Sequence, residues 1–319
     1  MKSGKFLSLV LAVIILSLAA GCSRTPSADT SSPSPQPTLN QTSAPEGITV
    51  TDMLGRVITL DKPAEKVVAL TAADCEILYA IGSGDAIVGR GEYCDYPIEV
   101  LAVPAVQSGA ATNVEQIISL APQIVIMAKM AQTVEQVASL EAAGIKVVIS
   151  DADDIAGTYT AIELIGELVG KSDEAAALIE DMRSEFDLIK SKATGDGGKT
   201  VYFEVSPLEF GLWTAGSGTF MDELAGLLGL TNIFEDITGW AEVSEEQVIA
   251  RNPDYIVTIT MFYGDGPTPE EEIMSRAGWQ SVTAVAEKKV LNVDSYEIAR
   301  PGPRLVNAAE TLYSFIYGD

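Results

Sequence analysis

The chain has 319 residues, of which 45 are acidic and 20 are basic, so its formal net charge is −25 at pH 7. This acidic balance excludes a nucleic-acid-binding surface, because phosphate binding requires clustered Lys and Arg. The sequence contains no histidine, which excludes histidine-based zinc sites and Ser-His-Asp triads. The length predicts about two domains, and the hydrophobic content of 47% is ample for a sizeable core.

Residues 1–21 have the organisation of a lipoprotein signal peptide. Two lysines form a basic n-region, and the apolar h-region that follows is too short for a comfortable transmembrane span. Small residues then precede Cys22, as in the bacterial lipobox, where the cysteine thiol receives diacylglycerol and becomes the first residue after cleavage. We therefore expect a protein anchored through Cys22 in the cell membrane, on the extracytoplasmic side. An ordinary signal peptide cleaved near Ala20 is the alternative.

The segment 22–46 is rich in Ser, Thr and Pro and has almost no large apolar residues. Such a segment cannot bury enough surface to offset the entropy lost on ordering. It is therefore predicted to be a flexible tether between the membrane and the folded part of the chain.

From residue 48 onward, short apolar segments alternate with helical ones. The segments 48–51 and 57–60 flank a turn that contains glycine, which predicts a β-hairpin. The alternation that follows implies a parallel sheet with both faces covered. Strands are predicted at residues 67–70, 86–88, 124–127 and 147–149, and helices at residues 76–81, 114–120 and 134–143.

The middle of the chain is helical, and the pattern of the first half then returns. Helices are predicted at 155–169 and 173–192, and three glycines follow them. A weak internal repeat relates residues 114–126 to residues 243–257, each a short helix, a proline and a buried strand. In the second half, strands are predicted at 201–205, 255–260 and 290–293, and helices at 219–228, 244–250 and 304–317.

These patterns predict an α/β protein with two Rossmann-like lobes joined by a long helical connection, and a ligand cleft between the lobes. The N-lobe is expected at about residues 48–154, the helical spine at about 155–193 and the C-lobe at about 199–319.

Five segments, in order along the chain, carry a resemblance to a known family. They are the opening strand 66–70, the helix 74–82, the loop Tyr93-Cys94-Asp95-Tyr96-Pro97, the segment 239–247 and Arg300-Pro301-Gly302-Pro303-Arg304. With these segments, residues 67–319 resemble the iron-chelate and cobalamin type of periplasmic substrate-binding protein of ABC importers.

This resemblance implies a rigid interdomain helix, a shallow cleft and little hinge motion. It also implies a monomer that is not an enzyme and that delivers a metal chelate to the permease and ATPase subunits of an importer. No cofactor is expected, because the metal enters only as part of the bound chelate.

The sequence leaves several classes of ligand possible. The loop that begins at Tyr93 most resembles the cobalamin-binding branch, but Gly109 stands near a position where that branch can carry Trp. A cobalamin-like corrinoid and a ferric siderophore are both compatible. A haem-binding receptor of the same fold is a further alternative, in which a tyrosine replaces the missing histidine as axial ligand. An envelope α/β enzyme is the alternative from a different class, although no nucleophile with its base is visible.

A large, flat-faced and partly apolar chelate requires aromatic walls with a few polar donors. Arg300 is a candidate for binding a carboxylate or phosphate of the ligand in a bidentate fork, and a structural salt bridge is the alternative. The aromatic candidates, which core packing would also explain, are Tyr93, Tyr96, Trp213, Trp240, Phe262, Tyr263 and Tyr296.

The resemblance further implies that Glu76 and Glu246 are docking carboxylates, one in each lobe, that pair with arginines of the permease. The alternative is that they are solvated acids at helix ends, favoured by the helix dipole. Cys75 and Cys94 are candidates for a disulfide in an oxidising compartment, but the sequence cannot supply the distance that decides it. No metal-binding constellation is predicted.

Overall fold

The computed structural model describes residues 47–129, 133–193, 198–262, 264 and 266–318. All described residues belong to one compact unit. The predicted signal peptide, the lipidation site Cys22 and the tether therefore lie outside the described residues. Within the described ranges, no helix has the length and apolar character needed to span a membrane.

The first lobe is built on a five-stranded parallel sheet with the strand order β5-β4-β3-β6-β7. Strands β3 and β6 are buried along their whole length, as expected for apolar runs in a sheet covered on both faces. The predicted hairpin is confirmed, because β1 and β2 pair antiparallel. The strands are β1 (Ile48–Thr51), β2 (Val57–Leu60), β3 (Val67–Ala69), β4 (Ile87–Gly91), β5 (Ala105–Val106), β6 (Ile124–Met127) and β7 (Lys146–Ile149). The helices are α1 (Ala72–Ala80), α2 (Val114–Ser119) and α3 (Val134–Ala142), with 3₁₀ turns at Gly84–Ala86, Ile98–Ala102 and Gly109–Ala111.

The second lobe contains a four-stranded parallel sheet with the order β10-β8-β12-β13, and a separate antiparallel pair formed by β9 and β11. The strands are β8 (Thr200–Glu204), β9 (Leu212–Ala215), β10 (Thr231–Asn232), β11 (Trp240–Val243), β12 (Tyr255–Thr258) and β13 (Val290–Asn292). The helices are α6 (Phe220–Leu227), α7 (Glu245–Arg251), α8 (Pro269–Ser275), α9 (Thr283–Ala286), α10 (Ser295–Ile298) and α11 (Leu305–Tyr317), with 3₁₀ turns at Leu208–Phe210 and Trp279–Ser281.

Two long helices, α4 (Ile155–Val169) and α5 (Ser172–Lys192), join the lobes. The Asp154 side chain caps the start of α4, and Gly170 ends that helix in the left-handed conformation with φ 69°. A Cβ atom on Gly166 would lie 2.5 Å from the Cβ of Ala175, so glycine permits the close approach of the two helices.

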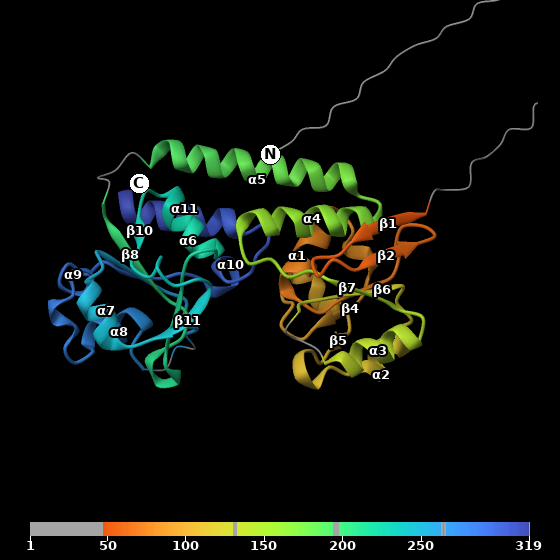
Figure 1. Ribbon diagram of the computed structural model, residues 1–319, viewed down its shortest axis with the longest axis horizontal. Coiled ribbons are helices and arrows are strands. Elements are labelled where there is room, and N and C mark those ends of the chain that lie inside the picture. Colours follow the sequence, from red (N-terminus) through yellow and green to blue (C-terminus); the bar gives the residue numbers. More distant parts are fainter. Residues whose placement is uncertain (1–46, 130–132, 194–197, 263, 265, 319) are drawn as a thin grey trace, which may run out of the picture. The chain divides into compact units, whose positions relative to one another are not determined.

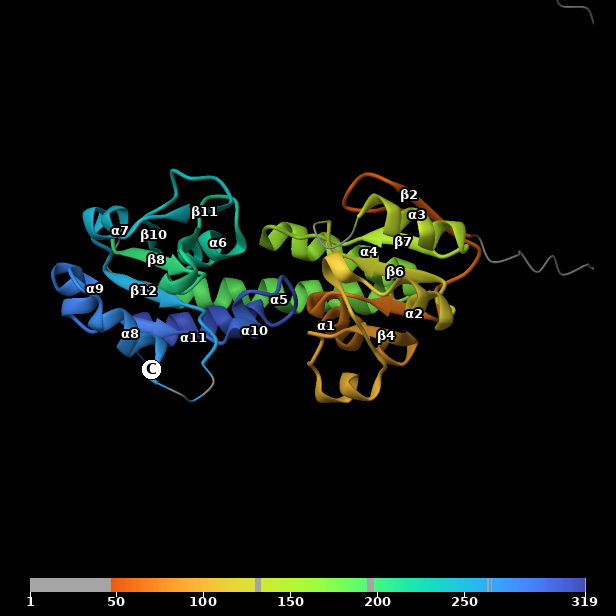
Figure 2. The same cartoon turned by 90° about the horizontal axis from the view of Figure 1, so that it is seen from below.

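Helix α4 packs against α1 and β1 of the first lobe, whereas α5 packs against α6 and α11 of the second lobe. Figures 1 and 2 accordingly place the two sheets near opposite ends of α5. One hydrophobic cluster runs from Ile126 in the first sheet through Phe186 in α5 to Phe203 in the second sheet. This continuous core confirms the predicted two-lobed α/β fold.

The structure also differs from the sequence prediction in specific elements. Helix α1 begins at Ala72 rather than at Glu76, because the Thr71 side chain caps it by accepting a hydrogen bond from the backbone N–H of Asp74. Trp213 and Trp240 lie in the strands β9 and β11, which were not predicted from the sequence. Helices α8, α9 and α10 were not predicted from the sequence, and α9 and α10, with 4 residues each, are too short to produce a recognisable period.

Candidate ligand-binding cleft

Two cavities lie where residues of both lobes meet, at the carboxyl ends of parallel strands, which is the usual place for ligand sites in open α/β sheets. The first cavity has a volume of about 460 Å³, and the second has a volume of about 710 Å³. The first is lined by residues 71–74, Ala128 and residues 150–153 of the N-lobe, and by Phe220, Trp240 and residues 299–301 of the C-lobe. The second is lined by Tyr93 and Asp95 of the N-lobe, and by Val205, Pro207, Glu209, Phe210, residues 259–261, Ser295, Tyr296, Ala299 and Arg300 of the C-lobe.

Arg300 lies in the walls of both cavities and belongs to an ion cluster that crosses from one lobe to the other. Its Nη1 donates to Glu76 Oε1 at 3.0 Å and to Asp95 Oδ1 at 2.7 Å. Arg304 donates from Nε and Nη2 to the two carboxylate oxygens of Glu76, at 2.8 and 2.6 Å. We refer to Glu76, Asp95, Arg300 and Arg304 as the inter-lobe ion cluster.

The environment of the two arginines keeps both of them charged. Burial opposes the charged form of Arg300, but hydrogen bonds with Asp95 and Glu76 outweigh this effect and raise its pKa. Burial likewise opposes the charge of Arg304, and the hydrogen bond with Glu76 again raises the pKa. The guanidinium groups also stack on aromatic rings, Arg300 on Tyr296 at 4.2 Å and Arg304 on Tyr96 at 4.1 Å.

The docking role of Glu76 stays a prediction, and the structure shows the surroundings of this residue. A docking carboxylate must be exposed to its partner, but Glu76 is only 3% exposed and binds two arginines of the same chain. The physical reason is the early start of α1, which places Glu76 inside the helix, among buried residues, rather than at its solvated end. For Arg300, the structure supports the salt-bridge alternative, because its guanidinium already binds two carboxylates.

The structure places some of the predicted aromatic residues in the cleft and others outside it. Tyr93 and Tyr296 line the second cavity, and Tyr93 is 72% exposed. Trp240 lines the first cavity and packs against Phe220, with 5.6 Å between the ring centroids. Tyr96 lies over Arg304, and Trp213 is exposed on β9; neither residue lines either cavity. Tyr263 lies outside the described residues.

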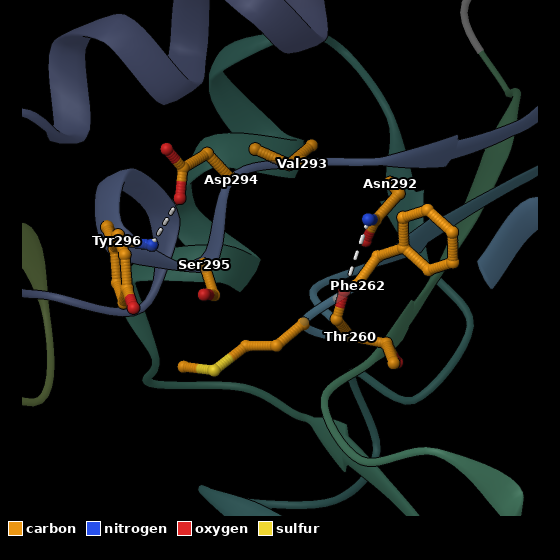
Figure 3. A pocket seen from close by; sticks show the side chains of 8 residues that line it. Thr260, Phe262, Asn292, Val293, Asp294, Ser295 and Tyr296 are labelled. Atoms are coloured by element: carbon orange, nitrogen blue, oxygen red, sulfur yellow. Dashed lines mark hydrogen bonds between the residues drawn. The ribbon is translucent and has the colours of Figure 1, made fainter. Parts of the chain in front are cut away.

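A smaller pocket of about 250 Å³ in the C-lobe adjoins the second cavity, with which it shares Thr260, Met261, Ser295 and Tyr296. Figure 3 shows its side chains, including the predicted residue Phe262. The Asn292 side chain donates to the carbonyl of Thr260 at 3.1 Å and so holds the end of β13 against the segment after β12.

Sequence reasoning missed two large apolar residues of the second cavity. Phe210 is 74% exposed in the 3₁₀ turn that follows β8, and Met261 is exposed just after β12. Both come shortly after a predicted buried strand, and the rule that ligand sites form at the carboxyl ends of strands could have found them.

Asp74 is a buried acid in the wall of the first cavity. It is 1% exposed, accepts a hydrogen bond from the Thr71 hydroxyl, and is also bonded to the Ser150 side chain. Loss of hydration on burial raises the pKa of Asp74 to about 6. Burial and the neighbouring Asp153 also raise the pKa of Asp151.

The candidate disulfide is not formed in the structure, where Cys75 and Cys94 are both free, buried thiols. Their sulfur atoms donate to the same acceptor, the Ala69 carbonyl, at 3.7 and 3.8 Å. The hydrogen bond with Cys94 and burial raise the pKa of the Cys75 thiol well above its ordinary value. Because the thiolate is the reactive form, Cys75 is expected to be inert near neutral pH.

Glu246 is exposed in the first turn of α7, where Ser244 and Gln247 form a capping box. Hydrogen bonds from its own backbone and from the Ser244 side chain lower the pKa of Glu246. Across the described part of the chain, no group of three or more Cys, Asp or Glu residues is arranged to hold a metal ion.

A protein with two α/β lobes and a cleft at their strand ends has the architecture of a solute-binding protein. The chain belongs to the periplasmic binding protein family, whose model matches residues 67–297. This match confirms the family resemblance predicted from the sequence. Members of the family bind solutes and are not enzymes.

Three relatives place the chain more closely. It is 35% identical over 278 residues to YvrC of Bacillus subtilis, an uncharacterized ABC transporter substrate-binding lipoprotein, with coverage of 85% of this chain and 86% of YvrC. The structure of a possible iron-binding periplasmic solute-binding protein from Staphylococcus epidermidis is 30% identical, with a TM-score of 0.70, and covers 80% of this chain and 100% of that chain. The structure of the vitamin B12-binding protein BtuF of Vibrio cholerae is 25% identical, with a TM-score of 0.66, and covers 79% of this chain and 96% of that chain.

Proposed function

We propose that this chain is the extracytoplasmic solute-binding component of an ABC import system, and that it captures a cobalamin-like corrinoid or a ferric siderophore and delivers it to the permease. The observation that carries this proposal is the pair of cavities between the lobes, which are walled by exposed aromatic residues and lie at strand ends. Their volumes of about 460 and 710 Å³ suit a ligand much larger than a single metal ion. The names of YvrC, a substrate-binding lipoprotein of an ABC transporter, and of BtuF, a vitamin B12-binding protein, support the same proposed function.

A haem-binding receptor is the second candidate, and one observation favours it. Tyr93 lines the second cavity and is largely exposed, and tyrosine is an axial ligand of haem iron in some proteins.

A screen for ligand-induced stabilisation tests the proposal. The purified full-length protein is heated with cobalamin, cobinamide, a ferric hydroxamate, a ferric catecholate and haem in separate samples. A ligand at a hundredfold excess over its Kd stabilises the native state by about 2.7 kcal/mol, which a melting curve resolves. The proposal is wrong if none of these chelates raises Tm.

The location of the protein is part of the proposal. We infer that a lipid on Cys22 holds the protein on the outer face of the cell membrane, since small residues precede that cysteine as in a lipobox. In a bacterial host, Cys22→Ala should move the protein from the detergent phase to the aqueous phase. A mature Cys22→Ala protein that still enters the detergent phase would contradict the anchor.

A further inference from the structure

The charged side chains that line the two cavities are mostly acidic. Their charge affects which ligands the proposed binding site can accept. The charged side chains of the first cavity are Asp74, Asp151, Asp153 and Arg300. Those of the second cavity are Asp95, Glu209 and again Arg300. Among the described residues that line the two cavities, Arg300 is thus the only cationic side chain. Aromatic walls and size mark these cavities as a ligand site independently of their charge.

Arg300 is already engaged with carboxylates of its own chain. Its guanidinium binds Glu76 and Asp95 and lies over the ring of Tyr296. A ligand carboxylate would have to compete with Glu76 and Asp95 for this guanidinium, and the Arg300 side chain is only 11% exposed. Arg304 remains on Glu76 but does not line either cavity.

The acids of the cleft have little cationic compensation of their own. Lys129 is exposed and partly offsets the charge of Asp151, but it does not line either cavity. Glu209 and Asp153 are exposed in the cavity walls, and neither has an ion pair in the described structure. A ligand that covers these carboxylates removes water from them, and the cost of that step is lowered by positive charge and increased by negative charge on the ligand.

We infer that the cleft accepts chelates of neutral or positive net charge and discriminates against anionic ones. This inference rests on the proposed function and narrows its ligand class. Arg and Lys side chains are the usual charged partners of carboxylate, catecholate and phosphate groups, and the described cavity walls offer none outside an ion pair. Haem, with its two propionates, and ferric tris-catecholates are therefore disfavoured, whereas corrinoids with amide side chains and ferric hydroxamates of neutral or positive charge remain.

The experiment compares chelates that share one metal-binding core and differ only in charge. Ferric desferrioxamine B carries a free ammonium group and is cationic. Its N-acetylated form is neutral, and its N-succinylated form is anionic. A second series uses aquocobalamin, cyanocobalamin and a monocarboxylate derivative of cyanocobalamin. Affinities for the full-length protein are measured by tryptophan fluorescence or calorimetry at low and high salt.

In the series that binds, the cationic member should bind at least about tenfold more tightly than the anionic member, and this ratio should fall as salt rises, because screening weakens interactions of partly exposed charges. The triple variant Asp151→Asn, Asp153→Asn, Glu209→Gln should reduce the ratio. Its matched control is Glu180→Gln, Asp181→Asn, Glu185→Gln, which removes the same formal charge from exposed positions of α5, outside the cavities.

The outcomes distinguish failure of the charge inference from failure of the proposed function. An anionic member that binds as tightly as its cationic counterpart overturns the charge inference and leaves the proposed function standing. A control variant that reduces the ratio as much as the cleft variant also overturns it, since net charge alone would then explain the effect. If neither series binds but a ferric catecholate or haem stabilises the protein in the screen above, the charge inference is overturned. If no chelate binds in either experiment, the proposed function fails and the inference fails with it.

Discussion

Asp74 shows how a single buried carboxyl group can link the stability of the fold to pH. The pKa of its carboxyl group is about 6 in the folded chain, against an ordinary value of 3.8 in the unfolded chain. The folded state therefore holds the proton more tightly. The stability that this group contributes is full below about pH 4 and is lost as pH rises through about 6.

Asp74→Asn should therefore stabilise the protein at neutral pH. The amide keeps an oxygen that accepts from Thr71 but carries no charge, so the free energy of unfolding should rise by up to about 3 kcal/mol at pH 7.5, because each pKa unit corresponds to about 1.4 kcal/mol. At about pH 4 the variant and the parent should be alike. Urea unfolding at the two pH values measures both differences. Asp181→Asn, on the exposed side of α5, is the control. An Asp74→Asn protein that is less stable than the parent at both pH values would contradict the expected effect of the Asp74 charge.

The two cleft-candidate tryptophans make a matched pair of variants. Trp240 lines the first cavity, whereas Trp213 is about equally exposed on the neighbouring strand β9 but lines neither cavity. We expect Trp240→Ala to weaken ligand binding by about 1 kcal/mol or more, as truncation of an aromatic contact at a binding centre commonly does. Trp213→Ala should change the affinity little. Titration of both variants with the ligand found in the screen measures this, and equal losses would place the ligand on the β9–β11 surface instead.

At the scale of elements, local patterns in the sequence predicted most strands and helices. Apolar runs such as 124–127 are decisive because a parallel strand buried on both faces has no polar positions. What local patterns cannot show is which side chains meet across the cleft. Arg300 and Glu76 are 224 residues apart in the chain, and only the packing of the two lobes brings them together. The burial of Glu76 was not predicted for this reason, since a glutamate in a short helix is expected to be solvated unless its distant partners are known.

The inter-lobe ion cluster should contribute to stability through α1. Glu76→Gln removes the charge that faces two partly buried guanidinium groups and is expected to destabilise the fold by about 3 kcal/mol, the range found when one partner of a buried pair is removed. Glu65→Gln, in an exposed pair with Lys62, should cost less than about 1 kcal/mol. Denaturant unfolding of both variants measures the contrast. Equal and small effects would mean that solvent screens the inter-lobe cluster as it screens a surface pair.

At the scale of the whole molecule, the excess of acidic residues gives a net charge of −25, which favours encounter with a basic surface at low ionic strength. A carboxylate at the edge of such a surface sets orientation and association rate more than final affinity. Of the two glutamates predicted to dock onto a permease, only Glu246 is exposed.

Glu246→Lys should slow association with the importer and leave ligand affinity unchanged, because Glu246 lies in the first turn of α7 and lines neither cavity. The loss should be largest at low salt and should shrink as ionic strength rises. Uptake by the reconstituted importer and ligand binding by the free protein are measured side by side, with Glu185→Lys on α5 as a control of equal charge change.

Glu76→Lys should instead lower Tm, since it places a third cation beside Arg300 and Arg304. If Glu76→Lys keeps its Tm and its ligand affinity but loses uptake, Glu76 is a docking residue after all, and the burial of its carboxylate under the two arginines does not persist when the importer binds.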